Sequence, residues 1–339
     1  MNTRIDRRYF LRAASNLGMA LTATKLGRRL APLGLGVAVG GNAEAAVTEY
    51  ARTAKLLVLD SGGADWLNTY EGGSAVAEVI AETPTPLVKK HIANLRYQDM
   101  VISVGSNISS ALKEWIQLML GNEQEPLGGV ITSTDYRGNP LSSLAFKYAL
   151  ISEVGLPALD ARSRESVFLT LKIAPETTLR GKPTGKPSLP PYASNRKRWL
   201  AANFRLGFDG DASLSNACRR VSKIDAITVK QVFNGQDLGE SREPIKRGHL
   251  EISNLVITLP EAFAEPFYAW HQSFVIDGVN SDKDEKSVTL EYLAQDLKET
   301  LFTLKLLNVG IISVTPVPAG SDQLSQVKVE MYCEQLSFN

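Results

Sequence analysis

The sequence predicts a mainly β fold of the α+β type, with two tandem domains that are each an antiparallel β-barrel or sandwich with one short packing helix. Three observations lead to this prediction: a strand-then-tryptophan phrase that occurs twice, alternating apolar runs that flank both copies, and a helical apolar stripe in each copy. The chain has 339 residues, which is long enough for two ordinary domains.

The repeated phrase reads LRYQDMVISVGSNISSALKEW from Leu95 to Trp115 and LEISNLVITLPEAFAEPFYAW from Leu250 to Trp270. At an offset of 155 positions and without a gap, the letters VIS fall on VIT and the two tryptophans coincide. With its flanking runs each copy spans roughly 130 residues, which is too long for a solenoid repeat. The pattern therefore indicates a duplicated domain rather than an array.

The periods inside each copy predict a strand followed by a helix. Met100–Val104 and Leu255–Leu259 are short runs rich in β-formers. Apolar residues then recur at the i, i+3, i+4 and i+7 positions typical of an amphipathic helix: Leu112, Trp115, Ile116 and Met119 in the first copy, and Phe267, Trp270 and Phe274 in the second. We expect Trp115 and Trp270 to anchor helix on sheet; a ligand-stacking role would require an exposed ring.

Further strands are expected on both sides of the phrase. LLVLDSGGAD and FRLGFDGDAS precede the two copies as alternating runs that end in Gly- and Asp-rich turns. A hairpin follows each copy, and at an offset of 158 Val130 meets Val288 and Ile151 meets Val309. VFLTLKI and VKVEMYC close the copies. Each unit should therefore consist mostly of antiparallel strands.

These elements predict four segments. Residues 1–46 form a signal or a basic tail, 47–178 the first domain, 179–199 a linker and 200–339 the second domain. The stretch TTLRGKPTGKPSLPPYASNRKRW holds four prolines, two glycines and several basic residues with little periodicity. This composition is typical of an extended, semi-rigid linker; a phosphate-seeking basic patch is the alternative.

The N-terminus resembles a twin-arginine export signal. Arg7 and Arg8 are followed by Phe10 and Leu11, and Ala43-Glu44-Ala45 supplies a small-x-small cleavage site. Export would place the protein in the periplasm or outside the cell. The alternative is a basic tail on a cytoplasmic protein, because lysine and arginine interrupt the apolar part. No apolar run approaches the roughly 20 residues of a membrane span.

Composition and motifs point away from catalysis and nucleic-acid binding. The formal net charge is +1, from 37 basic and 36 acidic side chains, and no basic patch suited to nucleic acid is apparent. Two cysteines and three histidines are scattered singly, so they build neither a disulfide framework nor a zinc site. The charged stretch Asp282-Lys283-Asp284-Glu285 fits a surface loop. No catalytic signature occurs, so we expect no enzyme, no cofactor and no metal.

In order, the motifs of the second copy resemble those of the tail-tube proteins of contractile phage tails, which are related in fold to the inner tubes of type VI secretion and other contractile injection systems. RGHLEISNLVIT begins with the basic-Gly pair of a family strand, and Phe267-Tyr268-Ala269-Trp270 matches the helical aromatic motif. SVTLEYL and LFTLKLLNVGIISVTP match the hairpin with its Pro-bearing loop, and VKVEMYCEQLSF carries Glu330 at the family's acidic position.

The resemblance covers nearly all of 201–339 and, more weakly, 55–176. The first copy departs from the pattern, since Thr170 replaces the acidic residue and Gly105-Ser106-Asn107 replaces part of the usual loop. The individual motifs are structural and unspecific; their repeated order carries the resemblance.

The resemblance implies a mechanical role. In that family six barrels form a ring around a β-lined lumen, and rings stack into a hollow tube. A duplicated chain would supply two of six positions, so three chains would make a homotrimeric, pseudo-sixfold ring. Its partners would be further copies of itself and other tail-like or baseplate proteins.

Three alternatives remain open from the sequence. The chain could be a hub or tube-initiating ring at the end of a tail-like machine. It could instead be an exported two-domain binding module that works as a monomer. An exported β-rich enzyme is the third, and it would need a polar cleft with convergent carboxylates.

Overall fold

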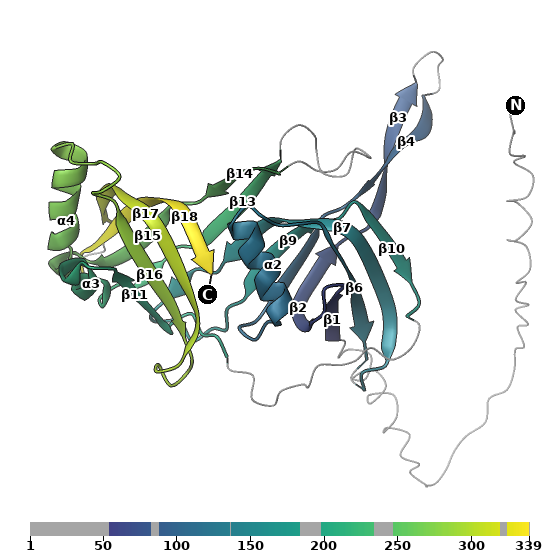
Figure 1. Ribbon diagram of the computed structural model, residues 1–339, viewed down its shortest axis with the longest axis horizontal. Coiled ribbons are helices and arrows are strands. Elements are labelled where there is room, and N and C mark those ends of the chain that lie inside the picture. Colours follow the sequence, from purple (N-terminus) through teal and green to yellow (C-terminus); the bar gives the residue numbers. More distant parts are fainter. Residues whose placement is uncertain are drawn as a thin grey trace, which may run out of the picture. The chain divides into compact units, whose positions relative to one another are not determined.

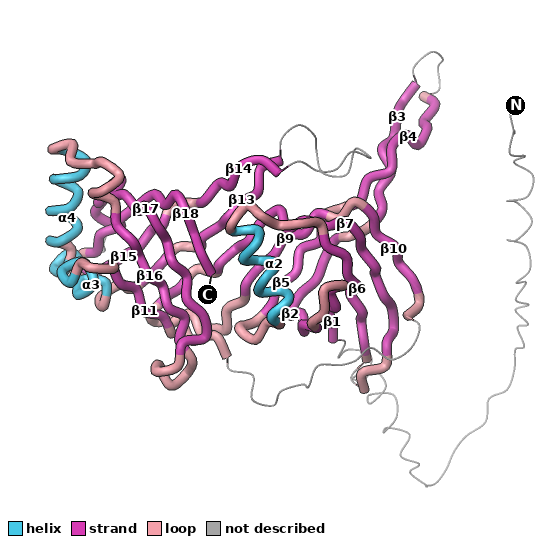
Figure 2. Tube along the Cα trace, viewed as in Figure 1, coloured by secondary structure: helices cyan, strands magenta, loops and turns pink. Residues whose placement is uncertain are grey.

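A computed structural model describes residues 54–82, 88–135, 137–183, 198–233, 247–318 and 324–338. Arg7, Arg8, Phe10 and Leu11 of the signal-like motif lie outside these ranges. The described residues contain three α-helices and are otherwise built mainly from antiparallel strands. Figure 2 shows the predominance of strands, drawn in magenta. The predicted fold class is therefore confirmed.

The first unit, the described part of 54–183, contains a closed six-stranded antiparallel barrel (Figure 1). The strands follow one another in the order β7-β6-β1-β2-β5-β9, and β9 pairs back onto β7. Their bounds are β1 Ala54–Leu59, β2 Ala64–Gly72, β5 Met100–Val104, β6 Leu127–Thr134, β7 Pro140–Leu156 and β9 Leu169–Ala174. Closure pairs the edges that an open sheet would expose.

Three further strands of the first unit lie outside the barrel order. β3 (Ala75–Glu82) and β4 (Lys89–Tyr97) form a separate two-stranded hairpin between β2 and β5, and this hairpin projects from the barrel (Figure 1). β10 (Thr177–Gly181) pairs with β7 and extends into the segment expected to be linker. Of that segment, 184–197 lies outside the described residues.

Helix α2 (Ser110–Leu120) follows β5, and its predicted stripe is buried in the hydrophobic cluster. Ser109 caps its N-terminus by accepting a hydrogen bond from the Leu112 N–H at 3.2 Å. The buried Asp65 in turn accepts bonds from the Ser109 N–H and hydroxyl, at 2.6 and 2.7 Å. The start of β2 is thereby tied to the start of the helix.

The second unit, the described part of 198–338, repeats this cyclic strand order with one interruption. Its order is β11-β16-β17-β18-β15-β12. The bounds are β11 Phe204–Phe208, β12 Lys223–Ile224, β15 Leu255–Pro260, β16 Lys286–Leu293, β17 Thr300–Val317 and β18 Gln326–Phe338. β11 and β12 take the places of β1 and β2, but among the described residues they do not pair with each other, so this barrel is open.

In the second unit, helices follow β11 and β15. α3 (Ala212–Cys218) lies between β11 and β12, where the first unit has only a tight turn. The segment after β15 comprises η2 (Glu261–Phe263), α4 (Glu265–His271) and η3 (Gln272–Ile276). α3 and α4 lie side by side at one end of the second sheet (Figure 1).

Strand registers correct the sequence match at two positions. Ile151 precedes the bulge in β7 and Ile311 precedes the equivalent bulge in β17, so Ile151 corresponds to Ile311 rather than to Val309. Leu59 pairs with Gly129, and Phe208 pairs with Val288, so Gly129 rather than Val130 corresponds to Val288. A gapless comparison cannot follow hairpins whose loops and bulges differ in length, and a one-residue slip exchanges the two faces of a strand. The match across β5 and β15 keeps its offset. The start of α2 follows the start of β5 by the same number of residues as the start of α4 follows the start of β15.

Candidate assembly interface

The main contact between the two units is a strand pairing. β13 (Ile227–Phe233) belongs to the second unit by sequence but pairs antiparallel with the end of β7. Val229 stands opposite Val154, and both side chains are buried. This pairing satisfies the backbone N–H and C=O groups of an edge that β6 leaves open beyond Ala149.

The hairpin partner of β13 extends the same sheet. β14 (Arg247–Ile252) pairs with β13 on its outer side, so the first sheet reaches nine strands with two supplied by the second unit. In return, β8 (Leu159–Asp160) of the first unit pairs with β12. Strands therefore cross the predicted domain boundary in both directions.

Side chains around α2 reinforce the contact. Gln117 Nε2 donates to the Phe338 carbonyl at 2.7 Å, at the end of β18. Asn122, after the helix, donates from Nδ2 to the Gly248 carbonyl at 3.1 Å and accepts from Gln231 Nε2 at 2.9 Å. Buried residues of both units also belong to one hydrophobic cluster. The two units thus meet over a continuous packed and hydrogen-bonded surface.

Different sides of the two units form this contact. The first unit contributes the β7 edge, β8 and the α2 region, whereas the second contributes its β13–β14 hairpin, β12 and the end of β18. Such a contact is heterologous, because each unit uses a surface that the other does not.

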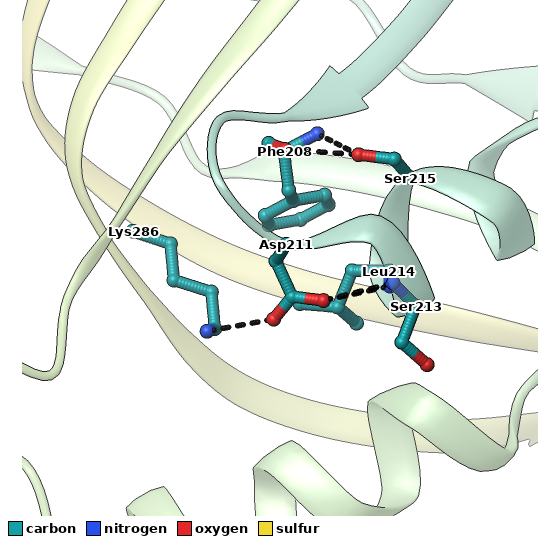
Figure 3. A network of polar contacts seen from close by, with 6 residues as sticks. All are labelled: Phe208, Asp211, Ser213, Leu214, Ser215 and Lys286. Carbon is teal, nitrogen blue, oxygen red and sulfur yellow. Dashed lines mark hydrogen bonds and ion pairs between the residues drawn. The ribbon is translucent and has the colours of Figure 1, made fainter.

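A polar network connects α3 and its N-terminal cap to β11 and β16 (Figure 3). Asp211 caps the helix by accepting from the backbone N–H groups of Ser213 and Leu214 at 3.1 and 3.0 Å. Lys286, at the start of β16, lies 3.0 Å from the second carboxylate oxygen. Ser215 donates to the Phe208 carbonyl and accepts from its N–H, each at 2.9 Å. The helix is therefore tied to both β11 and β16.

The network sets the protonation of Asp211. Partial burial by itself raises the pKa of this carboxyl, but the Leu214 N–H and the Lys286 ammonium outweigh it, and the pKa lies below its usual value. Because the folded-state pKa is lowered, the stabilisation is present above the ordinary carboxyl pKa and is lost as the pH falls through the lowered value.

We expect Asp211→Ala to lower the free energy of unfolding at pH 7 by about 1 kcal/mol, since the cap and the ion pair are both lost. Asp211→Asn keeps a capping oxygen and should cost less. Urea denaturation at pH 7 and near pH 3 measures both, and the cost of Asp211→Ala should shrink in acid. Equal losses for the two variants at pH 7 would contradict a capping role.

The structure places Trp115 on α2 and Trp270 on α4, both buried in the hydrophobic cluster. Trp270 packs edge-on against Phe208 at 5.6 Å and Phe274 at 6.0 Å between ring centroids, and the Lys286 ammonium lies 5.4 Å from its ring. Neither ring is available to stack on a ligand in this conformation. The role of the two tryptophans as anchors stays a prediction that mutation can test.

The described ranges contain two buried cysteines and one polar hollow. Burial raises the pKa of the Cys218 thiol to about 12 and that of the Cys333 thiol to about 11, so both stay protonated at neutral pH. Within these ranges no group of three or more His, Cys, Asp or Glu side chains is arranged to hold a metal. A polar hollow of about 690 Å3 lies between α3 and the η2–α4 segment, lined in part by Arg219, Arg220 and Glu265.

Among the helices that the structure describes, none is long and apolar enough to cross a bilayer.

The residues of the contact between the two units were not predicted from the sequence. β13 carries a recognisable alternation of Ile227, Val229 and Gln231, all buried, but alternation does not reveal which sheet a strand joins. Gln117 and Asn122 carry no sequence signal, because their partners lie far along the chain.

Comparison with known proteins gives similarities to solved structures alone. No family model matches the sequence, and no curated protein matches it either. The chain is similar to the tube-terminating cap of the anti-feeding prophage, with 18% identity over 38% of this chain and 88% of that chain, at a TM-score of 0.34.

Two further structures are similar over comparable lengths. One is a sheath-tube complex of an extracellular contractile injection system in its extended state, with 15% identity over 38% of this chain and 88% of that chain, at a TM-score of 0.34. The other is the Hcp1 protein from E. coli EAEC 042, with 17% identity over 34% of this chain and 72% of that chain, at a TM-score of 0.23. Each match covers less than half of this chain.

Proposed function

We propose that this chain is a structural subunit that assembles with copies of itself into a pseudo-sixfold ring or hollow tube, with three two-domain chains per ring. One observation carries the proposal: the second unit completes an edge of the first unit's sheet with its own hairpin. The contact between two units inside the chain is then the pattern for the contact between chains.

The geometry of a heterologous contact supports assembly beyond one chain. Two units joined in this way leave one unused surface of each kind, and repetition of the contact closes a ring or continues as a helix. Unpaired backbone groups on the unused edges favour such repetition. The shared cyclic strand order supports the view that the two units arose by tandem duplication and form domains on either side of the Pro-rich linker.

The ordered motifs of the second unit support a tail-tube-like role for the ring. Partners in this proposal are further copies of the chain, stacked rings and other tail-like or baseplate proteins, and no catalytic activity is assigned. Export by the twin-arginine route would place the assembly in the periplasm or outside the cell. If residues 1–46 are a basic tail instead, assembly takes place in the cytoplasm.

A hub or tube-initiating ring is a second candidate, and the difference between the units favours it. α3 opens the second barrel, whereas the first is closed. A ring of three such chains presents two kinds of unit alternately, so its surface is threefold rather than sixfold. That symmetry suits a junction between a threefold and a sixfold part of a machine.

Negative-stain electron microscopy of the concentrated full-length protein tests the proposal. Annular particles support a ring, stacked annuli or tubes support the tube role, and single rings that never stack support the hub. Uniform particles of single-chain size at every concentration would contradict self-assembly and favour a monomeric binding module.

A further inference from the structure

We infer that the β3–β4 hairpin of one chain pairs with the open edge of β17, residues Gly310–Val317, of a second copy. The pairing takes the register in which β13 and β7 pair within the chain. This inference rests on the proposed function, and it names the strands that join one chain to the next.

The edge of β17 corresponds to the edge of β7 that β13 covers. Both strands carry a bulge at the same place, between Ile151 and Glu153 in β7 and between Ile311 and Ser313 in β17. Beyond the bulge Val154 pairs with Leu171, whose other partner is the third residue of β5.

In the second unit Val314 pairs with Val329, whose other partner is the third residue of β15. Val314 therefore stands where Val154 stands in the first unit. The correspondence of the two edges follows from pairing registers rather than from sequence likeness.

This part of β17 has no strand partner on one side within the described ranges, although α4 and η3 contact β17. Its pairing with β16 ends at Lys286 and Val309, just as β6 leaves β7 at Leu127 and Ala149. From Gly310 to Val317 the strand pairs with β18 alone within the described ranges, although β7 has β13 at the corresponding place. Pro316 takes the position of Leu156 at the end of the ladder, where an edge strand tolerates proline.

The β3–β4 hairpin corresponds to the β13–β14 hairpin. The β3–β4 hairpin follows β2 and leads into β5, and the β13–β14 hairpin follows β12 and leads into β15. Ala75 pairs with Tyr97, three residues before β5, and Val229 pairs with Ile252, three residues before β15. Ala75 therefore holds the position of Val229, which puts it opposite Val314 of the second copy and puts the next residue, Val76, opposite Ser313.

The surface of the hairpin fits a partner strand. β3 and β4 pair only with each other in the described part of the chain, and an isolated two-stranded hairpin is at best marginally stable in water. Large apolar side chains are exposed on it, with exposed fractions from 43% for Val76 to 77% for Ile92. Exposed apolar groups gathered on one element mark an interaction surface.

A second copy of this chain is the occupant that the structure favours. The β17 edge has the same bulge and strand direction as the edge that already receives a hairpin of this kind, and the chain that offers the edge also offers the hairpin. Within one chain the hairpin belongs to the first unit and the β17 edge to the second. The contact therefore continues the β13–β7 interface from one chain to the next.

Cysteine pairs in the full-length protein test the register. Ala75→Cys with Val314→Cys, and Val76→Cys with Ser313→Cys, place two thiols directly opposite each other across the proposed ladder. Ala75→Cys with Ser313→Cys is the matched control, because a shift of one residue points the side chains to opposite faces. With oxidised glutathione as oxidant, we expect at least one in-register pair to give a covalent ladder that ends at three chains, and the control and wild type to give none.

Mixtures of single variants test the direction of the contact. Ala75→Cys mixed with Val314→Cys should give covalent pairs, and each variant alone should give none. Covalent dimers of Ala75→Cys alone would show hairpin pairing with hairpin, and this would overturn the inference.

A shortened hairpin provides a second test. Joining Val76 to Arg96 through an Asn-Gly turn removes most of the hairpin. We expect this variant to be folded by circular dichroism and monomeric by light scattering.

The outcomes separate this inference from the proposed function. If wild type forms rings but no in-register pair cross-links, the inference is wrong and the proposed function stands. Rings formed by a folded, shortened-hairpin variant lead to the same conclusion. If wild type stays monomeric, the proposed function is wrong and the inference fails with it. If the shortened variant does not fold, the cross-linking result decides.

Discussion

Replacing Val229 with aspartate is expected to lower the free energy of unfolding by roughly 3 kcal/mol or more. The Val229 side chain is fully buried opposite Val154, where strand β13 of the second unit completes the sheet of the first. A carboxylate there would lie between Val154 and Ile252 in an apolar seam. Urea denaturation followed by tryptophan fluorescence measures the loss.

Lys230 supplies the matched control on the same strand. It is the neighbouring residue, its side chain is exposed, and it stands opposite Glu153. Lys230→Thr should cost less than about 1 kcal/mol, the range of a cross-strand charge pair. If Val229→Asp costs no more than this control, β13 and β7 do not hold the two units together, and the pattern for contact between chains is lost.

Trp270→Ala should cost about 3–5 kcal/mol, the range for removing a large aromatic side chain from a core. The ring packs against Phe208 and Phe274, so its removal leaves a cavity between α4 and the second sheet. Trp115→Ala should cost a similar amount in the first unit, where that ring is also buried. Denaturant unfolding of each variant measures both.

The conservative change separates packing from hydrogen bonding at these positions. The buried Nε1 atoms of Trp115 and Trp270 make no hydrogen bond with any described residue. Phenylalanine keeps most of the ring and removes a buried donor, so Trp270→Phe should cost much less than Trp270→Ala. Equal costs for the two changes would contradict an anchoring role through packing.

Local periodicity made much of this fold predictable. Alternating residues placed the strands around the repeated phrase, and the apolar stripe from Leu112 to Met119 lies on α2 as expected. These signals depend on residues close in sequence, so one chain is enough to read them. The antiparallel, mainly β class follows from them.

Pairing between distant strands was not predictable in the same way. Residues 200–339 were expected to form the second domain, yet β13, which lies within them, joins β7 of the first unit. Many strands with the same alternation compete for one edge, and the choice among them depends on packing of the whole unit. The missing pairing between β11 and β12 was also not predicted, because α3 is short and its cap at Asp211 resembles an ordinary turn in the sequence.

The mass of the full-length protein in solution decides whether chains join through repeated edge pairing. Light scattering across a range of concentrations counts the chains in each particle. We expect a closed species of three times the 36.9 kDa of one chain, or whole multiples of that species if rings stack. A mass of 36.9 kDa that holds at the highest concentration would contradict assembly through repeated edge pairing.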